Sequence, residues 1–276
     1  MNQKLWTAIC ASLEAGQAIL EVYQSDFAVE QKADKSPLTL ADRRSHEIIV
    51  SPLEKMDHPI LSEEGKSIPY EERRQWNTFW LIDPLDGTKE FIKRNGEFTV
   101  NIALIDNQRP VLGVIYVPVT DTLYFGTSSH GAYKVDEARA ACRNAMADET
   151  ESHQAIDRLT GRSNKLPRPT DEPRPFTIVG SRSHSTPEVE RIVDEHKRIY
   201  GSVDFISAGS SLKICMVAEG RADLYPRTGP TMEWDTGAGQ AIAQAAGAEV
   251  VEFHSRVPLL YNKENLLNPW FTVRWP

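Results

Sequence analysis

The chain has 276 residues, 40% of them hydrophobic and 25% charged, a composition that excludes wholesale disorder and collagen-like repeats. Its 31 Lys and Arg residues against 39 Asp and Glu residues give a net charge of −8, so the average surface lacks the basic face that a nucleic-acid polymer would require. The length predicts roughly two lobes or one large layered α/β unit.

The first half of the chain begins with helical patterns and then changes to strands. Apolar side chains recur at helical spacing over residues 3–24, which predicts an amphipathic helix. Thr39 and Asp42 resemble a capping box and predict a second helix, which Ser51-Pro52 is expected to bend or end. Strand patterns follow at residues 79–82, 98–105, 111–117 and 123–125. Because the connections between these strands are short, we expect an antiparallel meander.

The second half alternates strands and helices, as layered α/β lobes do. Its expected strands are 176–179, 222–225 and 249–253, and its expected helices are 187–199, 210–219 and 235–246. Between the halves, residues 136–172 are polar and lose periodicity, so we expect an exposed, partly mobile connection there. The domain organisation predicted is an N-terminal α+β lobe (1–135), this connection (136–172) and a C-terminal α/β lobe (173–276).

Neither cysteines nor long apolar runs indicate an exported or membrane protein. The three cysteines are widely spaced, which argues against a disulfide framework and a thiolate zinc site. The longest apolar stretch, residues 111–119, is interrupted by Pro118 and falls far short of the ~20 residues of a membrane span. The apolar run after Lys4 resembles the start of a signal peptide, but the charged Glu14 soon interrupts it. We therefore expect a cytoplasmic protein with no integral membrane segment.

Paired aspartates carry the clearest chemical signal in the sequence. Asp83 and Asp86 follow an apolar strand on a turn that Pro84 and Gly87 shape. Two carboxylates forced into one small turn repel each other, and a divalent cation between them would relieve that repulsion. A plain surface turn is the alternative, because Asp, Pro and Gly are all turn residues.

Two further acidic positions favour the cation. Glu63 and Glu64 stand just before a turn, and Asp235 stands at the start of an expected helix, where an aspartate is often only a cap. Together with the paired aspartates they supply hard oxygen ligands, with no nearby His or Cys cluster. Such a donor set selects Mg²⁺ or Mn²⁺ over zinc or copper.

Three segments carry a family resemblance: the paired Glu63-Glu64, WLIDPLDGTKEF (80–91) and WDTGAG (234–239). They resemble the signature segments of the inositol monophosphatase superfamily, whose members are magnesium-dependent, lithium-sensitive phosphomonoesterases. Within it, the chain is most similar to the bacterial 3'(2'),5'-bisphosphate nucleotidases (the CysQ type), through residues 87–105, 181–184, 209–220 and 225–236. The resemblance covers nearly the whole chain and implies a layered αβαβα sandwich with the metal site between two lobes.

The resemblance also implies roles at the metal site. Asp83 would bridge two Mg²⁺ ions, the Glu64 carboxylate and the Leu85 backbone carbonyl would bind one of them, and Asp86 and Asp235 would bind the other. A third ion, and Mn²⁺ as a substitute, stay open. The neighbouring Glu63 is left without a role, because the resemblance prefers Glu64.

Further residues match the catalytic and substrate-binding positions of that family. Thr88 and Asp42 match the pair that orients and activates the nucleophilic water. The residues expected at the substrate are Glu64, Leu85, Asp86, Gly87, Thr88, His184, Ser210, Ser211, Lys213, Arg227 and Asp235. Among them, Ser210, Ser211 and Lys213 form a helix start, which we expect to hold a 5'-phosphate away from the metal ions.

The function implied is removal of the 3'-phosphate from adenosine 3',5'-bisphosphate, which leaves AMP and phosphate and clears a by-product of sulfate assimilation. Activity on phosphoadenylyl sulfate, a monomeric or homodimeric state and peripheral contact with the inner face of the bacterial inner membrane stay open. The first alternative is an inositol monophosphatase or related sugar phosphatase. The second is a non-catalytic, metal-dependent nucleotide-binding regulator, against which the Thr88 and Asp42 pair argues.

Overall fold

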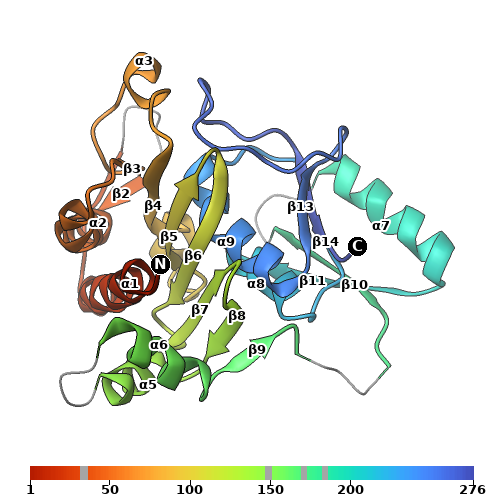
Figure 1. Ribbon diagram of the computed structural model, residues 1–276. Helices are drawn as coiled ribbons and strands as arrows, with labels where there is room; N and C mark the ends of the chain where they lie inside the picture. Colours follow the sequence, from red (N-terminus) through yellow and green to blue (C-terminus); the bar gives the residue numbers. More distant parts are fainter. Residues whose placement is uncertain (32–36, 147–150, 169–172, 182–185) are drawn as a thin grey trace.

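The computed structural model describes residues 1–31, 37–146, 151–168, 173–181 and 186–276 (Figure 1). Its helices are α1 (Asn2–Tyr23), α2 (Leu40–Leu53), η1 (Glu54–Met56), α3 (Tyr70–Arg73), α4 (Thr88–Ile92), α5 (Ala138–Ala145), α6 (Ser152–Thr160), α7 (Pro187–Tyr200), α8 (Leu212–Ala218) and α9 (Glu233–Ala246). Its strands are β1 (Val29–Gln31), β2 (Pro37–Thr39), β3 (Ile60–Ser62), β4 (Thr78–Asp86), β5 (Thr99–Asp106), β6 (Arg109–Val117), β7 (Thr122–Thr127), β8 (Gly131–Val135), β9 (Asn164–Leu166), β10 (Phe176–Ser181), β11 (Val203–Ala208), β12 (Leu224–Arg227), β13 (Glu249–Glu252) and β14 (Phe271–Arg274).

Seven strands from the first part of the chain form the larger sheet, in the order β3-β4-β5-β6-β7-β8-β9. Pairing from β4 to β9 is antiparallel, which confirms the predicted meander, and only β3 pairs in parallel with β4. The β4–β5 register shifts between Asp83 and Asp86. This irregularity bends the end of β4 away from a regular ladder at the position of the paired aspartates.

The second sheet has five strands in the order β11-β10-β12-β14-β13. Strand β10 pairs in parallel with β11 and β12, and β14 pairs antiparallel with both β12 and β13. The predicted alternation of strands and helices in this half is confirmed, but β11 and β14 were not expected from the sequence. A short antiparallel pair, β1 and β2, stands apart from both sheets.

The layers follow the order α-β-α-β-α, which confirms the expected fold class. Helices α1 and α2 pack on one face of the larger sheet, and α9 packs on its other face. Helix α8 lies beside α9 and also contacts the five-stranded sheet, whose outer face α7 covers (Figure 1). The two middle helices therefore fill the space between the sheets.

Both faces of the larger sheet are buried, and β4 shows this residue by residue. Trp80 and Ile82 pack into the core under α1 and α2, whereas Phe79 and Leu81 pack into the core between the sheets. Successive side chains of a strand point to opposite faces, so a strand covered on both sides is apolar throughout. A Cβ added at Gly113 of β6 would stand 2.2 Å from a backbone oxygen of α9, so that helix lies directly on the sheet.

The two N-terminal helices match their sequence predictions. Helix α1 covers the predicted span, and α2 begins at a capping box in which the Thr39 amide donates to Asp42 Oδ2 across 2.7 Å. Pro52 lies in the last turn of α2, one residue before the helix ends. Of the helices in the described ranges, none has the length and hydropathy to cross a membrane.

The expectation of an exposed connection over residues 136–172 is wrong for most of that segment. Its described residues form α5, α6 and β9, and β9 completes the larger sheet beside β8. Small apolar side chains at helical spacing, such as Ala138 and Cys142 of α5, are buried with Ile156 of α6 against the core under α1. Both helices are short and polar overall, so in the sequence their few buried side chains do not distinguish them from a connection. The division into lobes at 135 and 173 stays a proposal, with the larger sheet running on to Leu166.

Candidate active site

The end of β4 presents two aspartates at the edge of the space between the sheets. Asp83 is buried, and its Oδ1 accepts a hydrogen bond from the Leu85 amide across 3.1 Å. Asp86 Oδ2 accepts one from Asn101 Nδ2 across 3.3 Å. Gly87 follows with a φ of +94°, a conformation that strains other residues, and it allows α4 to begin directly after the turn.

A hydroxyl–carboxylate pair stands beside this turn. Thr88 Oγ1 lies 3.2 Å from Asp42 Oδ1 and 3.4 Å from the Leu85 carbonyl oxygen. The other carboxylate oxygen of Asp42 accepts from the amide and the hydroxyl of Thr39, at 2.7 and 2.6 Å. The capping box of α2 thus also orients Asp42 toward Thr88.

Three aspartates of the site repel one another in a buried setting. Burial first, and then neighbouring carboxylates, raise the pKa of Asp83 and of Asp235 well above its usual value. Burial likewise raises the pKa of Asp86 to about 6, against the opposing influence of Lys213. Negative charge gathered in this way is what a divalent cation neutralises, so the chemistry of the donor set fits Mg²⁺. Within the described ranges, no three carboxylate, imidazole or thiol groups lie close enough together to hold an ion.

Of the adjacent glutamates after β3, Glu63 acts on Asp83. Its charge and its side-chain hydrogen bond are among the causes that raise the pKa of Asp83, after burial. The charge of Glu64 instead acts on Arg43, whose pKa is raised first by Glu30. Sequence reasoning left Glu63 without a role, because two adjacent carboxylates give no signal of which one faces the site. Glu64 as a metal ligand stays a proposal.

Asp235 lies in the first turn of α9, and its carboxylate also has a structural contact. Asp235 Oδ2 accepts a hydrogen bond from the Met232 amide across 2.9 Å, which closes the capping turn of the helix. Asp235 can therefore cap the helix and bind a cation at the same time, because its second carboxylate oxygen is not used by the cap.

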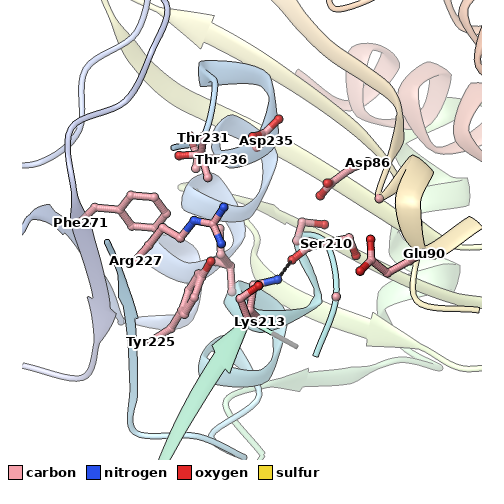
Figure 2. Close-up of a pocket in the computed structure, with 15 residues that line it drawn as sticks. Asp86, Glu90, Ser210, Lys213, Tyr225, Arg227, Thr231, Asp235, Thr236 and Phe271 are labelled. Carbon is pink, nitrogen blue, oxygen red and sulfur yellow. Dashed lines mark hydrogen bonds between the residues drawn. The ribbon is translucent and has the colours of Figure 1, made fainter. Parts of the chain in front are cut away.

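A cavity of about 130 Å³ lies between the two larger sheets and brings seven predicted site residues together (Figure 2). These residues are Asp86, Gly87, Ser210, Ser211, Lys213, Arg227 and Asp235. Sequence reasoning missed eight others in its lining: Glu90, Ser181, Gly209, Ile214, Tyr225, Thr231, Thr236 and Phe271. The volume is below the ~300 Å³ of typical small-molecule pockets.

Two polar groups of this cavity have unused hydrogen-bonding capacity. The Ser210 hydroxyl and the Arg227 Nε are buried and have no hydrogen-bond partner among the described residues. Ser210 also has a φ of +43°, whereas Arg227 uses its Nη2 to donate to the Pro230 carbonyl across 2.8 Å. Figure 2 shows the Arg227 guanidinium reaching into the space that Asp86 and Asp235 border. Buried polar atoms without partners are rare in folded proteins, and at the lining of a cavity they are available to a bound molecule.

Ser211 and Lys213 differ from the expectation of a free anion site. The Lys213 ammonium donates to the carbonyls of Ala208 and Ser210, at 3.2 and 2.5 Å, and burial lowers its pKa to about 8. The Ser211 hydroxyl lies 2.9 Å from Asn101 Oδ1, to which it donates. A buried ammonium needs acceptors, so these side chains hold the loop in shape, and Ser210 alone of the three keeps an unused hydroxyl.

The remaining predicted residues lie around the cavity or outside the described ranges. Glu64 follows β3, Asp83 and Leu85 lie in the last residues of β4, and Thr88 begins α4. None of these four residues lines the cavity itself. His184 lies outside the described residues.

An αβαβα sandwich with clustered carboxylates between its sheets defines a class, and the comparisons with known proteins identify it. Residues 1–270 match the inositol monophosphatase family, and the chain belongs to this family. It is 44% identical, over 94% of both chains, to the Escherichia coli (strain K12) protein named 3'(2'),5'-bisphosphate nucleotidase CysQ. The protein of the same name from Haemophilus influenzae is 32% identical over 99% of this chain and 91% of its own.

Solved structures show the same relationship. The CysQ crystal structure from Bacteroides thetaiotaomicron, described as a bacterial member of the inositol monophosphatase family, superposes with a TM-score of 0.87 and 49% identity. The superposition covers 100% of this chain and 98% of the chain from Bacteroides thetaiotaomicron. The Thermotoga maritima IMPase TM1415 has a TM-score of 0.70 at 19% identity, covering 99% and 92%, and supports the fold alone.

Proposed function

We propose that this protein is a magnesium-dependent phosphomonoesterase that hydrolyses adenosine 3',5'-bisphosphate to AMP and phosphate. Family membership and the names of relatives at 44% and 49% identity support the activity. One observation in the structure carries the choice of substrate. The cavity joins a carboxylate side, with Asp86 and Asp235, to an anion side, with the unpartnered atoms of Ser210 and Arg227. A substrate with two phosphates uses both sides.

The carboxylate side would hold the cations. Asp83, Asp86 and Asp235, with Glu64 and the Leu85 carbonyl, are the groups assigned to two or three Mg²⁺ ions, for which Mn²⁺ can substitute. When bound, the ions neutralise phosphate oxygens and lower the pKa of water. The raised pKa values of the three aspartates support this assignment, because the protein supplies too little positive charge of its own there.

Thr88 and Asp42 would orient the attacking water. The Thr88 hydroxyl donates a hydrogen bond to Asp42 Oδ1, so the lone pairs of its oxygen are free to accept a hydrogen bond from water. Asp42 is the group that can take up the proton that the attacking water loses, and hydrogen bonds from Thr39 hold the Asp42 carboxylate in place. Positioning of this kind is the main contribution that a protein makes to phosphoryl transfer.

The anion side would read the second phosphate. Arg227 offers charged donors and Ser210 a hydroxyl, while Lys213 adds positive charge from behind the loop. An inositol monophosphate carries no second phosphate and would leave these groups unpartnered. The proposal places the enzyme in the cytoplasm, where it removes a nucleotide by-product of sulfate assimilation.

Phosphate release by the purified protein with Mg²⁺ tests the proposal. The substrates to compare are adenosine 3',5'-bisphosphate, adenosine 3'-phosphate and inositol 1-phosphate, each with and without a chelator. We expect the bisphosphate to have the highest kcat/KM and the chelator to abolish release. A preference for inositol 1-phosphate would replace the nucleotide by a sugar phosphate, and no release from any of the three would overturn the enzymatic assignment.

A further inference from the structure

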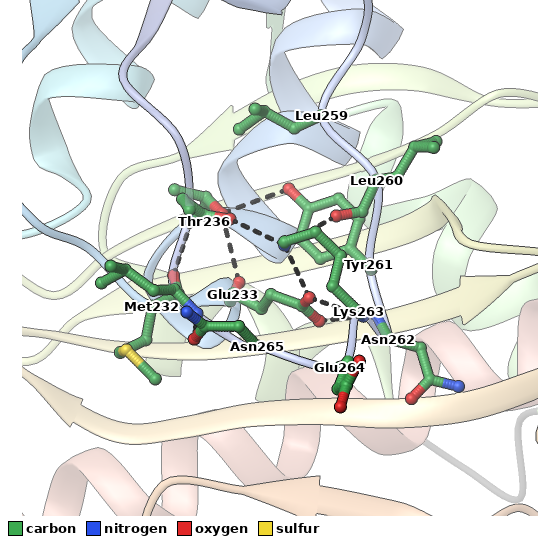
Figure 3. Close-up of polar contacts among 12 residues, drawn as sticks. Met232, Glu233, Thr236, Leu259, Leu260, Tyr261, Asn262, Lys263, Glu264 and Asn265 are labelled. Atoms are coloured by element: carbon green, nitrogen blue, oxygen red, sulfur yellow. Dashed lines mark hydrogen bonds and ion pairs between the residues drawn. The ribbon is translucent and has the colours of Figure 1, made fainter. Parts of the chain in front are cut away.

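A segment close to the C-terminus frames the first turn of α9 (Figure 3). This segment, residues 261–268, is called the brace below. The Met232 and Leu267 backbones form an isolated antiparallel bridge, and the Glu233 amide donates to the Leu266 carbonyl across 3.0 Å. The brace is therefore hydrogen-bonded to the helix start two residues before Asp235.

The Glu233 side chain joins α9 to the brace through three hydrogen bonds. Its carboxylate is fully buried and accepts from the amides of Asn262 and Lys263, at 2.6 and 3.0 Å. The Lys263 ammonium completes the set at 2.6 Å and also donates to the Leu260 carbonyl at 3.0 Å. One buried carboxylate thus fixes the entrance of the brace by two amides and one cation.

Asn268 connects the other end of the brace to the same helix turn. Its Nδ2 donates to the Met232 carbonyl across 2.8 Å and to Thr236 Oγ1 across 3.0 Å. The amide of Met232, in turn, donates to Asp235 Oδ2 across 2.9 Å. Only one residue, Met232, therefore separates the brace from the carboxylate of Asp235.

The brace also reaches the segment between β3 and β4, where Arg73 of α3 is buried. The Arg73 guanidinium donates to Asn262 Oδ1 and to the Glu264 carbonyl, at 3.1 and 2.7 Å. Asn262 Nδ2 returns a hydrogen bond to the Arg73 carbonyl across 2.6 Å. The brace thus ties the element that follows Glu63 and Glu64 to the element that carries Asp235.

From this geometry we propose that Glu233, held by Lys263, is a positioning residue that sets the Asp235 carboxylate for cation binding. The inference rests on the proposed function, which assigns Asp235 to a cation. A buried ion pair adds little net stability compared with apolar side chains of equal volume, so stability alone is a weak reason for placing one here. Glu233 stands in the same helix turn as Asp235, so the contacts that hold Glu233 also fix the position of the Asp235 backbone. Groups that orient metal ligands typically change metal affinity by ~10–100-fold when they are removed.

The variant Glu233→Gln tests this role, and the chain supplies a matched control in Glu219. Glu219 is also buried and paired with a lysine, with Lys134 Nζ at 3.2 Å, and it accepts from the Tyr124 hydroxyl. It stands at the end of α8, outside the cavity lining. Two quantities are measured for Glu233→Gln and for Glu219→Gln. The Mg²⁺ affinity comes from calorimetric titration of cation-free protein, and the stability comes from urea unfolding in a chelator.

We expect both variants to lose stability, whereas only Glu233→Gln weakens Mg²⁺ binding, by about tenfold or more. Hydrogen exchange of the amides of residues 232–236 should also become faster in Glu233→Gln alone. If Glu233→Gln does not fold, Lys263→Met takes its place, because the Lys263 side chain is partly exposed. Lys263→Arg keeps the charge and should restore the affinity.

Two different failures can be told apart. If wild-type protein binds Mg²⁺ but Glu233→Gln and Lys263→Met bind it within about twofold of wild type, the positioning role is wrong and the proposed function stands. The role is also wrong if Glu219→Gln weakens Mg²⁺ binding as much as Glu233→Gln does. If wild-type protein neither binds Mg²⁺ nor releases phosphate with it, the proposed function fails, and this inference fails with it.

Discussion

The Thr88 hydroxyl donates to Asp42 Oδ1 across 3.2 Å and joins α4 to α2, from positions 46 residues apart in the chain. Both groups are constrained from behind, Asp42 by Thr39 and Thr88 by its position directly after Gly87. The pair is therefore fixed before any substrate binds, as a group that orients water must be.

Removal of the Thr88 hydroxyl should reduce catalysis without disturbing the fold. In Thr88→Val the shape is kept but the hydrogen bond to Asp42 is lost, so we expect kcat to fall by ~10²–10⁴-fold. The Mg²⁺ affinity should change little. Thr122→Val in β7 is the control, because that hydroxyl donates only locally, to the Thr120 carbonyl. Equal kcat values for the two variants would contradict the role of Thr88.

The Asp83 carboxylate should be needed for turnover and costly for folding. Asp83→Asn keeps the size of the side chain but removes a negative charge from the proposed cation site, so turnover should fall by at least ~10³, or about 4 kcal/mol of barrier. Because burial raises the pKa of Asp83, its ionised form destabilises the cation-free fold at neutral pH. Urea unfolding in a chelator should therefore show a higher midpoint for the variant, and a lower midpoint would count against the buried charge.

The stability of cation-free protein should depend on pH in a definite direction. The pKa of Asp86 is raised from 3.8 to about 6, so between these values the folded state holds a proton that the unfolded state has lost. Stability therefore decreases as the pH rises through this window. The free energy of unfolding is measured in a chelator from pH 4 to 7 for wild-type protein and for Asp86→Asn. The difference between the two pH curves gives the contribution of Asp86. No difference in slope would show that Asp86 titrates normally.

The anion side of the cavity should discriminate between substrates. Charge-assisted contacts contribute ~1.5–3 kcal/mol each, so Arg227→Met should lower kcat/KM for adenosine 3',5'-bisphosphate by roughly 10–150-fold. The same change should affect adenosine 3'-phosphate much less, because that nucleotide places no phosphate there. The ratio of the two losses cancels general damage to the cation site. Equal losses would move Arg227 from phosphate recognition to the support of Asp235, whose pKa it also influences.

Local patterns explain what the sequence could predict. Helices α1 and α2, the strands β4 to β7 and the acidic turn after Ile82 follow from side chains close together in the chain. The aspartates of that turn could be linked to a cation only together with the other acidic positions and the family resemblance, and this link stays a proposal.

Long-range contacts explain what the sequence could not predict. The pairing of Arg73 with Asn262 spans 189 positions, and the burial of Lys213 depends on β12 and α4 closing around its loop. Likewise, the pairing of β3 with β4 brings Glu63 close to Asp83, and two adjacent identical residues give no sign of it. No local pattern encodes such contacts.

The product formed from adenosine 3',5'-bisphosphate tests the central claim most directly, because it shows which phosphate lies on the carboxylate side. The purified protein is incubated with this nucleotide and Mg²⁺, and the products are separated by chromatography. We expect phosphate and adenosine 5'-phosphate in equal amounts, with neither formed in a chelator. Adenosine 3'-phosphate as the product, or release that does not require a divalent cation, would contradict this claim.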